Sequence, residues 1–190
     1  MNFKKIILYR EPAISQINIK KLTKFLKYNF QVKVEIKDNV FKEISLKDMK
    51  KISNSKNNLA IVSPDVGGVV RARAFAKRID AALVIIDKRR EKAEVSEVMN
   101  IIGEVQNKTC IILDDIADSA GTLCNAATAL KNSGAKEIYS YIVHGVLSGN
   151  ALKKIEDSYI KELVLTDSIL ASKEVKNTKN IRHISIAPLL

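Results

Sequence analysis

Short apolar runs alternate with longer amphipathic segments from residue 59 onwards, and this alternation restricts the possible folds most strongly. A run such as residues 59–62 is apolar throughout and too short for a helix, which is typical of a strand buried on both faces of a sheet. Alternating strands and helices predict an α/β fold with a mainly parallel sheet flanked by helices. The predicted strands cover residues 59–62, 82–86, 98–105, 109–113, 137–143, 162–165 and 181–186, and the predicted helices residues 67–80, 121–133 and 148–155.

The first 58 residues differ in composition from the rest of the chain. This difference predicts a small basic αβ segment of unknown role over residues 1–58 and a separate domain over residues 59–190. They contain 14 Lys and Arg against 5 Asp and Glu, and so supply most of the net charge of +11. We expect strands over residues 5–9 and 31–36, helices over residues 17–30 and 45–52, and a polar boundary at residues 53–58. A basic segment can indicate nucleic-acid binding, but a solvated lysine-rich surface is the simpler interpretation.

Composition also excludes several classes of protein. No run of apolar residues approaches the roughly 20 that a membrane-spanning helix needs. The apolar run at residues 6–9 is too short for a signal peptide and lacks a small-residue cleavage site, so we expect a cytoplasmic protein that does not bind membranes. Cys110 and Cys124 are too few for a disulfide scaffold and lack the spacing of metal ligands, so both are expected to be reduced and buried.

In open α/β sheets, ligands bind beyond the carboxyl ends of the strands, and the first candidate segment follows the strand at residues 59–62. Ser63, Gly67 and Gly68 can form a phosphate loop, because glycine lets the backbone approach a ligand and the next helix begins there. Asp65 can hold a hydrated Mg²⁺. Arg71 and Arg73 lie near the start of that helix. The alternative is an ordinary turn from a strand into a helix.

The second candidate segment follows the strand at residues 109–113 and begins with two adjacent carboxylates. Each carboxylate can accept hydrogen bonds from the hydroxyls of a vicinal diol. The small residues that follow can surround a phosphate with backbone N–H groups at the start of a helix. The alternative is a helix N-cap formed by Asp118 or Ser119. The candidate ligand-binding residues are Asp114, Asp115, Asp118, Ser119, Ala120, Gly121 and Thr122.

The third candidate segment is the charged run at residues 87–94. We expect residues 88–97 to form an exposed loop. It leaves the strand at residues 82–86 at the same edge of the sheet as the other two segments. Mobile cations at this edge can close over phosphates and stabilise the charge that develops during group transfer. The alternative is a solvated surface, which is what most charge runs form. His144, His183 and residues 148–150 are weaker candidates, and structural roles explain them most simply.

Together these motifs resemble those of the ribose-phosphate pyrophosphokinases. The acidic pair followed by residues 118–122 is similar to the ribose-phosphate motif that this family shares with the phosphoribosyltransferases. Residues 63–74 resemble its pyrophosphate loop, and residues 86–90 with 95–103 resemble its flexible catalytic loop. Residues 144–151 are also similar to the family. The resemblance covers residues 59–190, with Ser119 at a position where the family more often has threonine.

The resemblance implies a phosphoribosyltransferase-like fold and a kinase of nucleotide biosynthesis. The implied reaction transfers diphosphate from ATP to ribose 5-phosphate and gives phosphoribosyl diphosphate and AMP. Lys88 and Arg90 would stabilise the transition state, Asp65 would bind the cofactor Mg²⁺, and the enzyme would be a homo-oligomer. Ribose 5-phosphate would be bound by Asp114, Asp115, Asp118, Ser119, Gly121 and Thr122.

Two other functions remain open at this point. Residues 1–58 show no match to the ATP-gripping N-terminal half of the family, so a non-catalytic subunit that binds ribose phosphate and regulates a pyrophosphokinase is one alternative. A phosphoribosyltransferase that consumes phosphoribosyl diphosphate is the other, and residues 1–58 could then form the hood over a nucleobase. The charged strip from Lys88 to Arg90 and residues 95–103 favour the pyrophosphokinase.

Overall fold

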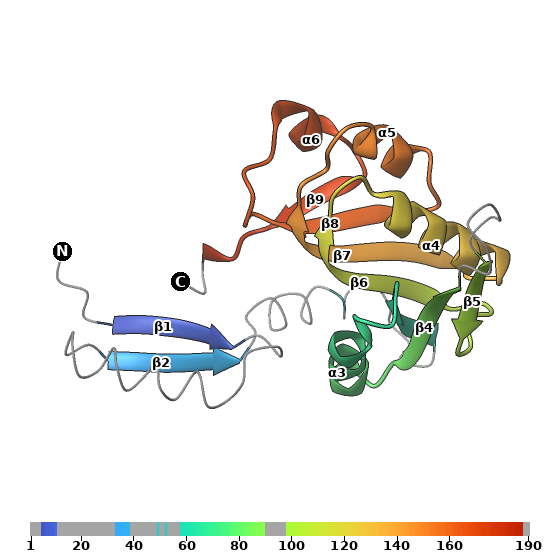
Figure 1. Ribbon diagram of the computed structural model, residues 1–190, viewed down its shortest axis with the longest axis horizontal. Helices are drawn as coiled ribbons and strands as arrows, with labels where there is room; N and C mark the ends of the chain where they lie inside the picture. The colour runs from blue at the N-terminus through green and yellow to red at the C-terminus, as the bar shows by residue number, and fades with distance from the viewer. Residues whose placement is uncertain are drawn as a thin grey trace.

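The computed structural model describes residues 5–10, 33–38, 49, 52, 58–89 and 98–187, and the side chains of 49, 52, 58–87 and 100–187. The main body is a seven-stranded sheet in the order β5-β4-β3-β6-β7-β8-β9 (Figure 1). All neighbours in this sheet are parallel except β4 and β5. The strands are β3 Leu59–Ser63, β4 Ala82–Arg89, β5 Val98–Ile102, β6 Thr109–Ala117, β7 Glu137–Gly145, β8 Glu162–Thr166 and β9 Ile181–Ile184. The predicted α/β fold with a mainly parallel sheet is confirmed.

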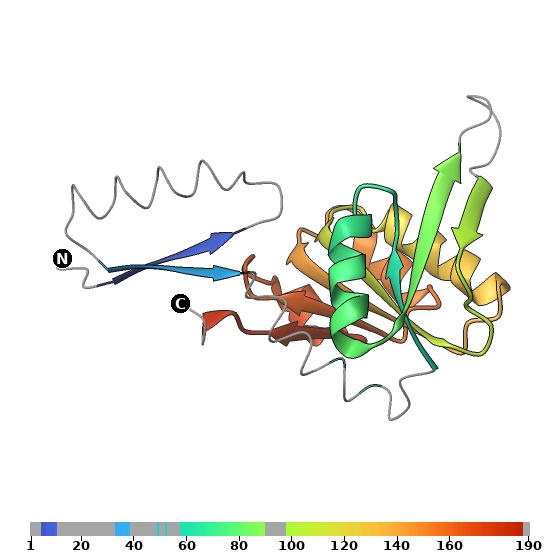
Figure 2. The same cartoon turned by 90° about the horizontal axis from the view of Figure 1, so that it is seen from below.

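Helices cover both faces of the sheet. Helices α4 (Gly121–Asn132), α5 (Ala151–Glu156) and α6 (Lys173–Asn177) lie on one face, and α3 (Val69–Ile79) lies on the other (Figures 1 and 2). Every residue of β3 is buried, as expected for a strand covered on both faces. The side chains that point to the two faces accordingly form two separate apolar cores.

Several elements differ from the sequence-based expectation. Strand β6 continues to Ala117, so Asp114 and Asp115 lie within it and do not follow it, and β5 ends at Ile102. The charged residues 88 and 89 are not in a loop but continue β4, where Lys88 pairs with Met99 and Arg89 with Val98 of β5. An antiparallel partner strand supplies the hydrogen bonds that keep these charged residues extended. Helix α6 was not predicted, because it is only five residues long, and its signal is the N-cap Ser172, whose hydroxyl accepts from the Val175 amide.

The described part of the first 58 residues contains strands β1 (Lys5–Arg10) and β2 (Lys33–Asp38), which form a separate parallel pair. Both strands were predicted, whereas the helix expected over residues 17–30 lies outside the described residues. Met49 and Ile52 are helical, and the buried Met49 packs into the core beneath α3. The boundary at residues 53–58 stays a prediction.

Two properties expected from composition can be compared with the structure. Among the described residues, none belongs to a helix long and apolar enough to cross a membrane. Cys110 is buried, and this burial raises the pKa of its thiol to about 12. Cys124 is only partly buried, which differs from the expectation, and its sulfur donates to the Lys154 carbonyl oxygen at 3.4 Å.

Candidate functional site

Three neighbouring parallel strands bring the three candidate segments to one edge of the sheet. β3 lies between β4 and β6, so the carboxyl ends of all three strands point the same way. In Figure 2, β4 and β5 extend beyond the end of β3 on this side. The side chain of Lys88 and the whole of Arg90 lie outside the described residues. The strand order therefore places the backbone of Lys88 at the same edge as residues 63–68 and 114–122.

The loop after β3 is held by its own side chains. Ser63 Oγ donates a hydrogen bond to the Asp65 carbonyl oxygen at 2.7 Å, and Asp65 Oδ1 accepts one from the Gly68 amide at 2.8 Å. A Cβ atom on Gly68 would lie 2.7 Å from Ser63 Oγ, so this position is restricted to glycine. Helix α3 then begins without a side-chain cap and without an acidic residue in its first turn. Its positive N-terminal end is thus available to an anion.

The two adjacent carboxylates lie in the last part of β6, and both are held by an arginine of α3. Arg71 Nη2 lies 3.3 Å from Asp114 Oδ1, and Arg71 Nη1 lies 3.1 Å from Asp115 Oδ2. The Asp115 amide also donates to Asp114 Oδ1 at 2.9 Å. The loop after β3 and the acidic pair of β6 are therefore parts of one connected site.

The acidic pair is electrostatically uneven. Burial raises the pKa of Asp114 to about 6, and the neighbouring carboxylates of Asp115 and Asp65 add to this effect. Burial also acts on Asp115, but the charge of Arg71 and its hydrogen bond outweigh burial and lower the pKa of Asp115. Two negative charges on adjacent carboxylates repel each other, so ionisation of one disfavours ionisation of the other. Asp114 is thus the member of the pair that takes up a proton first.

The second loop presents the N-terminal end of α4. Ala120 has a left-handed backbone with φ of 57°, and it precedes α4 as its N-cap without a side-chain hydrogen bond. The alternative in which Asp118 or Ser119 caps this helix is therefore wrong. Asp118, Ser119 and Thr122 are exposed and Gly121 is half-buried, so the loop and the start of α4 face solvent. Such a helix start can bind a phosphate group.

Neighbouring segments brace this loop. The amides of Val146 and Leu147 donate to the Ala117 carbonyl oxygen, at 3.0 and 3.1 Å, and the Ser148 amide donates to the Asp118 carbonyl oxygen at 3.0 Å. Residues 146–148 thus hold the start of the candidate phosphate loop in place. His144 is explained structurally, because its Nδ1 lies 2.9 Å from Ser168 Oγ.

Sequence reasoning did not find two cationic contacts of the site. Arg71 was noted only as lying near the start of α3, and its reach to the acidic pair depends on β3 and β6 being neighbours. Lys154 of α5 donates to the Ser119 carbonyl oxygen at 3.2 Å. Nothing in the local sequence marks it, because residues 119 and 154 are far apart in the chain.

The donor set fits a magnesium ion that is only partly bound by protein. No group of three or more His, Cys, Asp or Glu that could enclose a metal ion occurs among the residues with described side chains. Mg²⁺ usually takes one or two carboxylates and completes its shell with water and phosphate oxygens. One oxygen of Asp65 is engaged by Gly68, and a single remaining carboxylate oxygen suits such an ion.

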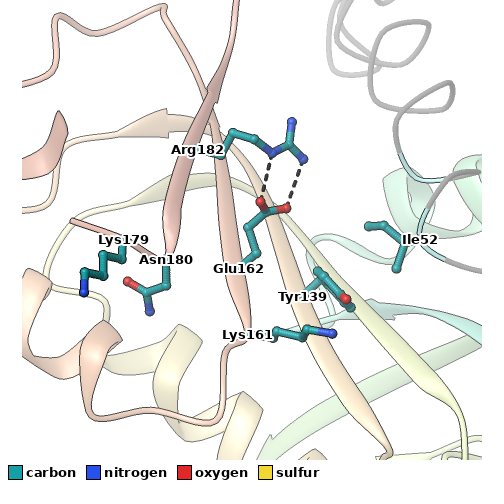
Figure 3. Close-up of a pocket in the computed structure, with 7 residues that line it drawn as sticks. All are labelled: Ile52, Tyr139, Lys161, Glu162, Lys179, Asn180 and Arg182. Atoms are coloured by element: carbon teal, nitrogen blue, oxygen red, sulfur yellow. Dashed lines mark hydrogen bonds and ion pairs between the residues drawn. The ribbon is translucent and has the colours of Figure 1, made fainter. Parts of the chain in front are cut away.

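A cavity of about 450 Å³ lies elsewhere, at the amino-terminal edge of the sheet (Figure 3). Its lining includes Tyr139, Glu162 and Arg182, near the starts of β7, β8 and β9. Glu162 and Arg182 pair with each other at 2.9 Å and 3.0 Å. Because the three candidate loops follow the opposite ends of their strands, this cavity is separate from the candidate site.

Comparison with known proteins identifies both the domain and its relatives. The family model described as "Phosphoribosyl transferase domain" matches residues 35–177. A ribose-phosphate pyrophosphokinase of Rhizobium meliloti (strain 1021) is 55% identical over 154 residues, which are 80% of this chain and 49% of that protein. A ribose-phosphate pyrophosphokinase of Bordetella pertussis (strain Tohama I) is 59% identical over 134 residues, which are 70% of this chain and 43% of that protein.

Solved structures with a similar fold include a phosphoribosylpyrophosphate synthetase and a transferase. The crystal structure of phosphoribosylpyrophosphate synthetase from Mycobacterium smegmatis has a TM-score of 0.74 and 25% identity, and covers 98% of this chain and 56% of that one. The crystal structure of APRTase from Giardia lamblia has a TM-score of 0.51 at 15% identity, covers 66% of this chain and 75% of that one, and supports the fold alone. The chain spans about half the length of the curated relatives it matches. With most of its length matched by the family model, the chain belongs to the phosphoribosyl transferase domain family.

Proposed function

We propose that the chain is the ribose 5-phosphate-binding part of a ribose-phosphate diphosphokinase. The reaction joins O1 of ribose 5-phosphate to the β-phosphorus of ATP and breaks the bond between that phosphorus and the α-phosphate oxygen. AMP leaves, the O1 proton is released, and phosphoribosyl diphosphate forms. The observation that carries the proposal is the acidic pair held by Arg71 beside the uncapped start of α4.

Each part of the site has a proposed role that follows from its chemistry. Asp114 and Asp115 accept hydrogen bonds from the two adjacent ribose hydroxyls. Asp118, Ser119, Ala120, Gly121 and Thr122 surround the 5-phosphate at the positive end of α4. The sugar is then held at its hydroxyls and at its 5-phosphate, and this orients O1 for attack on the β-phosphorus of ATP.

The diphosphate side of the site is proposed to lie at the loop after β3. Ser63, Gly67 and Gly68 hold the transferred group near the start of α3, and Asp65 holds the magnesium ion. When bound, Mg²⁺ would neutralise part of the negative charge on the transferred diphosphate group. Lys88 and Arg90 are proposed to stabilise the charge that develops on the transferred group, which is supported by the position of β4 beside β3.

The comparisons favour this proposal over a phosphoribosyltransferase. Identity to pyrophosphokinases exceeds 50% over 134 and 154 residues, whereas the transferase structure shares only 15%. A subunit that binds ribose 5-phosphate without turnover remains the second candidate, because the chain spans about half of those relatives. We further propose that the protein is cytoplasmic and that, as the resemblance implies, it is a homo-oligomer.

The proposal is tested by assaying AMP release from the purified chain with Mg²⁺, ATP and ribose 5-phosphate, together with calorimetry of ribose 5-phosphate binding. Binding with AMP release is expected. Binding without AMP release identifies the second candidate. Diphosphate release on addition of phosphoribosyl diphosphate and a nucleobase identifies a phosphoribosyltransferase, and the absence of ribose 5-phosphate binding contradicts the first two functions.

Binding of ribose 5-phosphate is expected to weaken as the pH falls below about 6. The pKa of Asp114 is raised to about 6, and a protonated carboxyl loses acceptor capacity that the sugar hydroxyls need. One linked proton lowers affinity by up to about tenfold per pH unit below that pKa. Calorimetry between pH 5 and 8 measures the profile.

The ligand also titrates in this range, since a phosphate monoester has a second pKa of roughly 6. The Asp114→Asn variant retains only the ligand's own titration and serves as the control. Identical profiles for the wild type and this variant would show that Asp114 does not titrate on binding.

A further inference from the structure

The side chain that connects the two loops of the site is carried by a firmly anchored helix. Arg71 is the third residue of α3, in its first turn. One residue later the buried Ala72 begins the apolar face of α3, which continues through Phe75, Ala76 and Ile79 into the core under β3. The guanidinium therefore starts from a fixed backbone position.

The contacts of Arg71 are divided between two carboxylates. Nη2 contacts Asp114 at 3.3 Å, and Nη1 contacts Asp115 at 3.1 Å. Nε is buried and has no hydrogen-bond partner among the described residues. Because the guanidinium is planar and rigid, contacts from its two terminal nitrogens fix the two carboxylates relative to each other.

Without a cation, two adjacent carboxylates repel each other and turn apart or take up a proton. The Arg71 and Asp114 side chains are only 21% and 19% exposed, so solvent screens this contact weakly. Asp115 is 56% exposed and thus remains accessible to a ligand while Arg71 holds its other side.

We propose that Arg71 is a positioning residue of the ribose 5-phosphate site, whose guanidinium holds Asp114 and Asp115 in the orientation in which both accept hydrogen bonds from adjacent sugar hydroxyls. This inference rests on the proposed function and gives a role to a residue that the roles proposed above do not include. It assigns Arg71 an action through the carboxylates rather than a contact with the sugar.

The test compares ribose 5-phosphate binding by the wild type, Arg71→Gln, Arg71→Lys and Arg78→Gln, using calorimetry with Mg²⁺ present. Arg71→Gln is expected to weaken binding by about 10- to 100-fold, as the loss of charged hydrogen bonds typically does. Arg71→Lys restores the charge without the fork and is expected to recover part of the loss. Arg78 is an exposed arginine in the last turn of the same helix, so Arg78→Gln is expected to bind like the wild type.

A second measurement separates positioning from a general loss of structure. Added methylguanidinium is expected to improve binding by Arg71→Gln and to leave binding by Arg78→Gln unchanged. Wild-type affinity in Arg71→Gln, equal losses in Arg71→Gln and Arg78→Gln, or no rescue by either methylguanidinium or lysine would each overturn the role of Arg71. Failure of the wild type itself to bind ribose 5-phosphate would instead contradict the proposed function.

Discussion

Replacement of Lys88 by alanine is expected to lower the rate of AMP release by about 10²- to 10³-fold, while ribose 5-phosphate still binds. Loss of one preorganised charged contact to a transition state typically has this effect. The expectation follows from the position of Lys88 on β4, beside the strand that leads into the loop with Asp65. The turnover number at saturating ATP and ribose 5-phosphate measures the first part, and calorimetry measures the second.

The control for Lys88→Ala is Lys131→Ala, which removes the same charge from the exposed last turn of α4, far from the loop at its start. This variant is expected to turn over at the wild-type rate. A normal rate in Lys88→Ala would remove Lys88 from the mechanism, and a matching loss in Lys131→Ala would show that only net charge matters.

Truncation of Phe75 to alanine is expected to lower the free energy of unfolding by about 3–5 kcal/mol. Phe75 is 1% exposed and packs in the core between α3 and the sheet, so its removal leaves a cavity. Such a loss is a large fraction of the roughly 5–15 kcal/mol that stabilises a typical domain. Urea denaturation followed by circular dichroism measures the change.

Val70→Ala is the matched control for Phe75→Ala, because Val70 lies on the same helix but is 69% exposed. Its expected effect is within about 0.5 kcal/mol, as for most surface substitutions. If the two variants unfold at the same urea concentration, α3 does not contribute to the cooperative core.

The sequence predicted most of the sheet because buried strands and amphipathic helices leave local periodic patterns. Six of the strands after residue 58 could be located as apolar runs, and β5 could be located to within a few residues. Its end was misplaced, since the predicted strand ran to residue 105 while β5 stops at Ile102 before Gly103, whose φ is 118°. The charged end of β4 was also misassigned, because its extended backbone depends on pairing with β5 rather than on its own residues.

Local sequence patterns also pointed to the acidic residues of the candidate site, but not to their electrostatic properties. Asp114 and Asp115 were identified as candidates because they follow the apolar run at residues 109–113, and the rule for the carboxyl edge of parallel strands applies without knowing the strand order. The structure extends this strand through both residues to Ala117. Their electrostatic difference could not be predicted. It depends on how deeply each carboxylate is buried and on Arg71, which lies 43 residues from Asp114.

The sequence by itself determined the α/β class, the order of the main elements and the loops that can bind phosphate. The class and the order of elements depend on apolar spacing, and the proposal that the loops bind phosphate depends on glycine and small residues, which act over a few positions of the chain. Only the tertiary structure decided that β3 and β6 are neighbours, and hence that α3 places an arginine against the acidic pair. The reason is that strand order results from the packing of the whole sheet, which no local pattern encodes.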